Sequence, residues 1–223
     1  MQAIDERFVT EELQLKLSGK SIRMLRVTNT DQLYAELVAK GDTDEEVKDE
    51  RIPYWADLWP SAIALATEVL QSASIKKGTR VLEIGCGLAL PGIAAGLKGA
   101  EVLMTDYMKE PLGFASINWK MNLPGTPALM QLDWRNPDAG LNYEVILASD
   151  IAYEKRSFGA LLKTFRTLLP PNGLILLSEP NRLIARDFIL NLPSEGFEVK
   201  QKGMEVPFHG RNNGVSVYQI RHK

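Results

Sequence analysis

The sequence predicts an α/β fold: an open, mostly parallel sheet that ends in an antiparallel hairpin. From Arg80 onward, short and almost continuously apolar strand patterns alternate with helical stretches. Such strands are buried on both faces, because helical crossovers cover a parallel sheet on each side. The alternation stops near the C-terminus, where two strand patterns, FEVKQKGMEVPF and VSVYQIRHK, follow one another without a helix between them. These two strands predict the closing hairpin.

Residues 1–52 predict a small, β-rich N-terminal extension. The segments LQLKLSG and SIRMLRVT alternate apolar and polar residues on the two sides of Gly19, a pattern typical of a β-hairpin. The stretch that follows has the spacing of a short helix. Acidic residues then crowd residues 41–53, which indicates a solvated linker or an exposed helical turn.

Two helix starts are predicted before the sheet begins. Thr30 or Asp31 is expected to cap the helix of the extension, and Gly41 to end it. A second helix is expected over residues 61–71, with Ser61 as its N-cap.

The main domain is predicted to span residues 53–223, with the extension as an elaboration of it. Its expected parallel strands are RVLEIG, EVLMTD, ALMQLD, EVILASD and GLILLSEP. The helical stretches between them are PGIAAGLKG, EPLGFASINWKMN and SFGALLKTFRTLL. With the final hairpin, this gives seven strands and helices on both faces.

Composition narrows the classes of function. The net charge is −2 and no long basic run occurs, so we expect neither a nucleic-acid nor a membrane partner. The one cysteine, Cys86, excludes an internal disulfide framework and a multi-cysteine zinc site, and no metal site is expected. The N-terminal residues lack a signal-peptide or transit pattern, and the cytoplasm is the expected location.

A glycine turn follows the first strand of the alternation. Glu83 ends the strand, Gly85 and Gly87 let the backbone approach a ligand closely, and a helix begins near Leu90. Asp106 closes the next strand, about twenty residues on, where a carboxylate can accept hydrogen bonds from ribose hydroxyls.

Dinucleotides, phosphate groups and S-adenosyl-L-methionine are all bound by related glycine turns. The dinucleotide fingerprint requires glycine at position 90, where this chain has leucine, and no Gly-Lys-Ser/Thr of a phosphate-binding loop occurs. An acidic residue two positions before the first glycine suits a ligand that carries an ammonium and a sulfonium, so S-adenosyl-L-methionine fits best. The alternative is that the glycines only make a tight turn.

Several separated motifs carry a resemblance to a known family. The stretch LEIGCGLALPGIAAGLKGAEVLMTD is similar to the cofactor turn of the class I, seven-β-strand S-adenosylmethionine-dependent methyltransferases, within them the lysine methyltransferase family 16 group. PYWADLWPSAIAL, LDW at 132–134, and the D-x-x-Y pattern from Asp150 to Tyr153 also match, and EPNR resembles a D-P-x-R stretch. The resemblance is strongest to the electron-transfer-flavoprotein β-subunit lysine methyltransferases, and it implies a Rossmann-like seven-stranded sheet.

The resemblance implies a cofactor pocket. Glu83 would meet the methionine ammonium, directly or through water, and Gly85 and Gly87 would leave space for it. Asp106 would hold the ribose, with Tyr107 flanking the adenine.

Four more residues complete the implied pocket. Asp133 would accept from the adenine amino group and Trp134 would pack nearby. Trp59 would wall the methionine side, and Ala148 would leave room for the sulfur end. Structural roles, as a turn cap for Asp133 or a packing residue for Trp134, are the alternatives.

Asp150 and Tyr153 are the candidate catalytic residues. Forming the neutral amine of a lysine with an ordinary pKa of ~10.4 costs about 4–5 kcal/mol at pH 7. A carboxylate favours the charged ammonium, so Asp150 is expected to dock and orient the nitrogen rather than to lower its pKa. Tyr153 would shape a water-poor entrance, and the sulfonium would push the lysine pKa down by repulsion.

The expected function is methyl transfer to a lysine side chain of a protein. The alternatives are a small-molecule N-methyltransferase, a protein arginine methyltransferase, and a cofactor-binding module without transfer activity. The Asn/Asp-Pro-Pro-Tyr loop of enzymes that act on adenine or glutamine is absent, since SDIAY stands in its place.

Asp150→Ala is predicted to abolish methyl transfer while cofactor binding survives, because the carboxylate is expected to act on the substrate nitrogen. A radiolabel transfer assay with the true substrate, paired with cofactor calorimetry, measures both. Unchanged turnover would remove Asp150 from this role.

Overall fold

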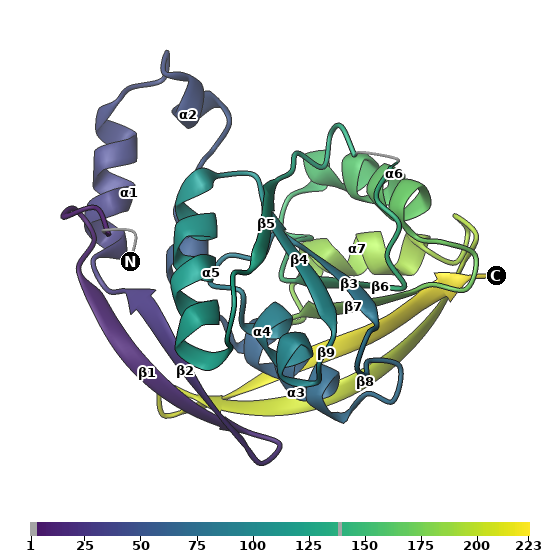
Figure 1. Cartoon of the computed structure of the whole chain (residues 1–223). Helices are drawn as coiled ribbons and strands as arrows, with labels where there is room; N and C mark the ends of the chain where they lie inside the picture. Colours follow the sequence, from purple (N-terminus) through teal and green to yellow (C-terminus); the bar gives the residue numbers. More distant parts are fainter. Residues whose placement is uncertain (1–3, 138–139) are drawn as a thin grey trace.

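The computed structural model describes residues 4–137 and 140–223 (Figure 1). The N-terminal elements are β1 (Thr10–Leu17), β2 (Lys20–Val27), α1 (Thr30–Ala39), α2 (Glu45–Lys48) and the short 3₁₀ turn η1 (Tyr54–Ala56). The strands of the main sheet are β3 (Arg80–Ile84), β4 (Glu101–Asp106), β5 (Ala128–Gln131), β6 (Val145–Ser149), β7 (Leu174–Glu179), β8 (Phe197–Phe208) and β9 (Arg211–His222). Its helices are α3 (Pro60–Gln71), α4 (Leu90–Leu97), α5 (Lys109–Asn122), α6 (Phe158–Leu168) and α7 (Leu183–Asn191), with the 3₁₀ turn η2 (Lys155–Ser157) before α6.

The main sheet has the strand order β5-β4-β3-β6-β7-β9-β8. The strands β5, β4, β3, β6 and β7 are parallel, and β9 and β8 close the sheet as an antiparallel pair. The chain proceeds from β3 toward one edge and then returns to place β6 on the other side of β3. Ligands of open α/β sheets bind at this kind of reversal, beyond the carboxyl ends of the strands.

Helices cover both faces of the sheet. Alternate residues of each buried strand point to opposite faces, so Val81 joins the core under α3, α4 and α5, while Leu82 joins the core under α6 and α7. Val145 and Ile146 on β6 divide in the same way. The predicted fold class, with its C-terminal hairpin and two covered faces, is confirmed.

The predicted N-terminal hairpin is present as a separate two-stranded sheet. Ser18 and Gly19 both have positive φ, 45° and 77°, as a two-residue hairpin turn requires. Ile22 and Met24 on β2 are fully buried in the core shared with α3, α4 and α5. The hairpin lies beside α5 (Figure 1) and therefore packs on the main body.

Two asparagines on α5 cover the second edge of β2. The buried Asn118 side chain accepts from the Leu25 amide at 2.6 Å and donates to the Leu25 carbonyl at 3.1 Å. One turn on, Asn122 accepts from the Arg23 amide at 2.8 Å and donates to its carbonyl at 2.6 Å. Asn118 also donates to the Leu88 carbonyl at 3.1 Å, which links the hairpin to the glycine turn.

Two predicted helix caps are wrong. Asn29, rather than Thr30 or Asp31, is the N-cap of α1, and its side chain accepts from the Val9 amide instead of capping the helix. Helix α3 starts at Pro60 after Trp59, because proline fits the first helical position. Ser61 therefore lies inside the helix.

One helix of the main domain was not predicted. Helix α7 follows the EPNR stretch and buries Ala185, Phe188 and Ile189 under the sheet. Exposed apolar residues at both ends, Leu183 and Leu190, obscure its amphipathic pattern. Within the described residues, no helix is both long and apolar enough to cross a bilayer. The domain boundary after residue 52 stays a prediction.

Asn118→Ala is predicted to lower the free energy of unfolding by about 2–3 kcal/mol, because it leaves the part-buried Leu25 amide and carbonyl and the buried Leu88 carbonyl without their partner. Urea denaturation measures the loss. Asn122→Ala is the matched control, with a loss below about 1 kcal/mol, since water can replace its less buried hydrogen bonds. Equal losses would contradict the linking role of Asn118.

Candidate active site

A cavity of about 700 Å³ opens at the carboxyl ends of β3, β4 and β6, where the strand order reverses. One wall is the glycine turn after β3. The opposite wall is formed by residues 49–59, a segment ahead of α3 that we call the strap. This volume is typical of cavities that hold a cofactor-sized ligand.

The glycine turn is held from beneath by Glu83. Its side chain is buried, does not line the cavity, and accepts a hydrogen bond from the Gly92 amide at 3.1 Å in the first turn of α4. Burial raises the pKa of Glu83 well above its usual value. A Cβ at position 92 would lie 2.4 Å from the Glu83 carboxylate, so only glycine fits there.

Gly85 and Gly87 line the cavity with positive φ, 61° and 50°. A Cβ at position 85 would lie 2.9 Å from the Trp134 ring and 3.2 Å from the Ile151 side chain. The close approach of Trp134 therefore requires glycine at this position, besides the backbone conformation.

Asp106 ties the end of β4 to the glycine turn. Its Oδ2 accepts from the Gly87 amide at 2.9 Å, and its Oδ1 from the Met108 amide at 3.2 Å. Burial raises the pKa of Asp106 to about 6 and outweighs the opposing effect of these backbone donors.

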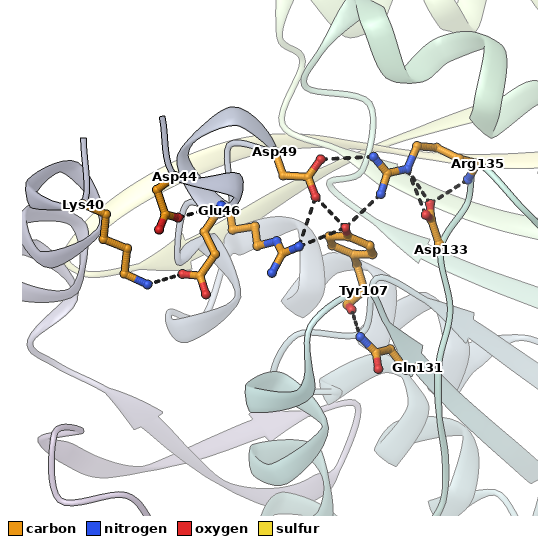
Figure 2. Close-up of polar contacts among 9 residues, drawn as sticks. Lys40, Asp44, Glu46, Asp49, Tyr107, Gln131, Asp133 and Arg135 are labelled. Carbon is orange, nitrogen blue, oxygen red and sulfur yellow. Dashed lines mark hydrogen bonds and ion pairs between the residues drawn. The ribbon is translucent and has the colours of Figure 1, made fainter. Parts of the chain in front are cut away.

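Tyr107 anchors the strap across the cavity (Figure 2). Its hydroxyl donates to Asp49 Oδ2 at 2.6 Å and accepts from Arg135 Nη2 at 2.9 Å. Arg135 also donates to Asp49 Oδ1 at 3.2 Å. The guanidinium carbons of Arg51 and Arg135 lie 5.3 and 5.0 Å from the centre of the tyrosine ring, within cation–π range. The tyrosine hydroxyl and the arginines hold the pKa of Asp49 at about 2.

Asp133 belongs to the same network. Both of its carboxylate oxygens accept from Arg135 Nε at 2.9 Å. Desolvation opposes ionisation of Asp133, but the hydrogen bonds and charge of Arg135 outweigh it, so its pKa lies below the usual value. Asp133 is therefore an ionised acceptor that already has an arginine partner.

Three aromatic side chains and one pair of charged residues line the part of the cavity that we call the mouth. Its residues are Tyr54, Trp59, Asp150, Tyr153 and Arg182. The Tyr54 ring packs edge-on against Tyr153 at 5.6 Å and against Trp59 at 6.2 Å. Tyr54 is 45% exposed and Tyr153 36%, so this rim faces solvent. Burial of its hydroxyl raises the pKa of Tyr153 to about 12, and the phenol is neutral at physiological pH.

Asp150 follows β6 with a positive φ of 55° and is paired with Arg182. The two guanidinium Nη atoms meet the two carboxylate oxygens, with Nη2 to Oδ2 at 3.1 Å. The carboxylate proposed to receive a substrate ammonium is therefore already neutralised by a cation of the chain itself.

The structure brings most of the predicted site residues to one cavity. Those that line it are Trp59, Gly85, Gly87, Asp106, Tyr107, Asp133, Trp134, Asp150 and Tyr153. Glu83 and Ala148 lie behind the wall, and Ala148 is fully buried in β6. The roles assigned to all of these residues stay predictions.

Sequence reasoning identified Trp59 on the strap but missed the charged residues at its start and the arginines. Asp49 and Arg51 lie in the segment predicted to be a solvated linker or an exposed helical turn, and Arg135 lies two residues after a predicted acceptor. Only Arg182 had a signal, as the last residue of the EPNR match.

Residues 46–194, more than half of the chain, match the family model described as lysine methyltransferase. The chain belongs to the lysine methyltransferase family. The predicted resemblance is confirmed, and this lysine methyltransferase family member is an S-adenosylmethionine-dependent methyltransferase.

Three relatives are similar to this family member. Mouse EEF1A lysine methyltransferase 3 is 30% identical over 183 residues, 78% of this chain and 75% of that protein. The zebrafish protein N-lysine methyltransferase METTL21A is 36% identical over 58% of this chain and 62% of its own length. The histone-arginine methyltransferase METTL23 of Xenopus laevis is 32% identical over 60% and 62%.

The fold matches solved methyltransferases. Magnesium protoporphyrin IX methyltransferase from Synechocystis PCC 6803, solved with bound S-adenosylmethionine, superposes with a TM-score of 0.58 at 15% identity and covers 87% of this chain and 91% of that one. The cavity suits that cofactor chemically: a carboxylate and close backbone lie at the strand ends. Two indole N–H groups, of Trp55 and Trp134, have no partner among the described residues.

Cofactor affinity is predicted to fall by up to about tenfold between pH 7.5 and pH 5. Asp106 is the predicted ribose acceptor, its pKa is about 6, and its protonated form would accept fewer hydrogen bonds from the ribose hydroxyls. Because that pKa lies above the ordinary 3.8, the contribution of Asp106 to the free energy of unfolding falls as the pH rises toward 6. Hydroxyl groups of a bound cofactor that donate to the ionised carboxylate would offset this loss. Calorimetry across this range measures the dissociation constant.

Asp106→Asn provides the control for this pH dependence. It should bind the cofactor more weakly at pH 7.5 and lose most of the slope, because the amide does not titrate. A slope that survives in this variant would assign the titration to another group.

Proposed function

We propose that this enzyme transfers a methyl group from S-adenosylmethionine to a lysine side chain of a protein. The observation that carries the proposal is the open mouth, where Tyr54 and Tyr153 are exposed beside the Asp150 carboxylate. An open aromatic rim suits a side chain presented by a larger partner, whereas a small-molecule enzyme needs a more enclosed site. Relatives named as protein-lysine methyltransferases support it.

Cys86, a free and buried thiol, is compatible with a reducing compartment, and we place the enzyme in the cytoplasm.

The cofactor would lie along the glycine turn. Asp106 would accept from the ribose hydroxyls, while Gly85 and Gly87 leave room for the methionine part. Tyr107 would flank the adenine. Glu83, which does not line the cavity, would act by fixing the turn through the Gly92 amide.

Four residues would complete the cofactor site. Asp133 would share its carboxylate between Arg135 and the adenine amino group. Trp134 would cover the bound cofactor, Trp59 would wall its methionine side, and the small Ala148 behind the wall would keep the strand end close to its sulfur.

The bound cofactor supplies a methyl group on a sulfonium, which is a good leaving group. The chain has to align the amine with the methyl and keep water out. Asp150 would orient the nitrogen through lone pairs that Arg182 leaves free, since a carboxylate offers about four acceptor sites. Tyr153 and Tyr54 would enclose the aliphatic stem of the lysine and exclude water.

The proposal is tested by adding purified enzyme and labelled S-adenosylmethionine to a lysate of cells that lack this protein. One strong labelled protein, with the label on a lysine Nζ in peptide mass spectrometry, is expected. Asp150→Ala enzyme is the inactive control, and a Lys→Arg substitution at the mapped position of the target should abolish labelling.

Other outcomes would replace the proposal. Label found only in low-mass material would indicate a small-molecule substrate. Label on arginine would indicate an arginine methyltransferase, the activity that the name of the Xenopus relative states.

A further inference from the structure

The Asp150–Arg182 pair is a feature of the mouth that the proposed function does not explain. Asp150 is held by its backbone, whose amide donates to the Ser178 carbonyl at 2.9 Å. Arg182 comes from the other side, at the N-cap of α7, where its amide donates to Glu179 Oε1 at 3.1 Å. The Asp150 side chain is 9% exposed and that of Arg182 34%. The end of β6 and the N-cap of α7 thus bring the pair together.

A second carboxylate stands behind the pair. Glu179 is buried at the end of β7, and its Oε1 lies 3.5 Å from Arg182 Nη1. Its Oε2 has no hydrogen-bond partner among the described residues. Burial raises the pKa of Glu179 to about 7, so this carboxyl is only partly ionised at neutral pH.

Other charged or titratable side chains line the same cavity as the pair. They are Tyr54 on the strap, Tyr153, Glu154 and Arg156 after β6, and Asp106 at the end of β4. Glu154 and Arg156 are themselves paired, with Nε to Oε2 at 2.7 Å, and the two tyrosines are phenols. Among these groups, the guanidinium of Arg182 is the cation that directly offsets Asp150.

The net charge at this point matters for an amine substrate. A carboxylate alone favours the ammonium form and raises the pKa of a lysine within 4–6 Å. That would add to the ~4–5 kcal/mol needed to form the neutral amine at pH 7. A carboxylate already paired with a guanidinium offers hydrogen-bond acceptors with little net negative charge.

We propose that Arg182 is a positioning residue that neutralises Asp150, so that the mouth orients the substrate amine without stabilising its protonated form. This inference rests on the proposed function. It assigns the two residues separate tasks. Asp150 orients the substrate nitrogen, and Arg182 prevents the Asp150 carboxylate from stabilising the ammonium form of the substrate. The proton leaves to solvent before the nitrogen attacks the methyl.

The test is the pH profile of kcat/KM with the methylated protein as substrate. In the wild-type enzyme the acidic limb should lie well below the ordinary lysine pKa of ~10.4. R182Q keeps a hydrogen-bond donor but removes the charge, and its limb should move about one pH unit higher. R182K keeps the charge and should leave the limb close to its wild-type position.

Two further variants separate this proposal from a purely structural role. R182Q/D150N removes both charges, so its limb should return toward the wild-type position even at a lower rate. E179Q should leave the limb in place, and an equal shift in E179Q and R182Q would assign the titration to Glu179 and overturn the proposal. A uniform loss of rate in R182Q at every pH would overturn it as well.

Wild-type enzyme offers a measurement that needs no variant. A substrate carrying aminoethylcysteine, whose amine is less basic, should shift the limb down by the difference between the two amine pKa values. An unshifted limb would overturn the proposal even if R182Q failed to fold. Absence of lysine methylation in the wild type would instead reject the proposed function itself.

Discussion

The contact between the Gly87 amide and the Asp106 carboxylate is the constraint on which the site depends. It exists because β3 and β4 run parallel in a fixed register, in which Ile84 pairs with Thr105. The Cys86 amide continues that pairing with a hydrogen bond to the Thr105 carbonyl at 2.9 Å. These contacts fix the glycine turn relative to the ends of β3 and β4, beside the cavity that opens where the strand order reverses.

The other wall of the cavity comes from chain that precedes the sheet. The strap is held by a phenol hydroxyl that donates to Asp49 and accepts from Arg135. Arg135 and Arg51 also donate directly to Asp49, so the contact does not rest on the hydroxyl alone. Arginine suits this position because its planar fork can serve Asp49, Asp133 and the tyrosine together. The start of the strap is thereby tied to the site rather than left as a free linker.

Periodicity predicted the sheet and most helices, since buried parallel strands are continuously apolar and their crossovers have helical spacing. Helix α7 was not predicted, because the exposed Leu183 and Leu190 obscure its amphipathic pattern. The predicted residues largely gathered in one cavity, because strand ends meet at the same edge of the sheet. Partners such as Asp49 with Tyr107 could not be predicted, since hydrogen bonds and ion pairs between distant segments leave no periodic pattern in the sequence. Arg182 was visible only as part of a motif.

The asparagines on α5 have a consequence beyond packing. A strand edge with free amide and carbonyl groups is a template for the addition of another chain, and proteins usually protect it with charge, proline or cover. Asn118 and Asn122 present paired donors and acceptors to alternate residues of β2, as a neighbouring strand would. The two asparagines therefore protect that edge of the hairpin from the addition of a strand of another chain, in place of a third strand.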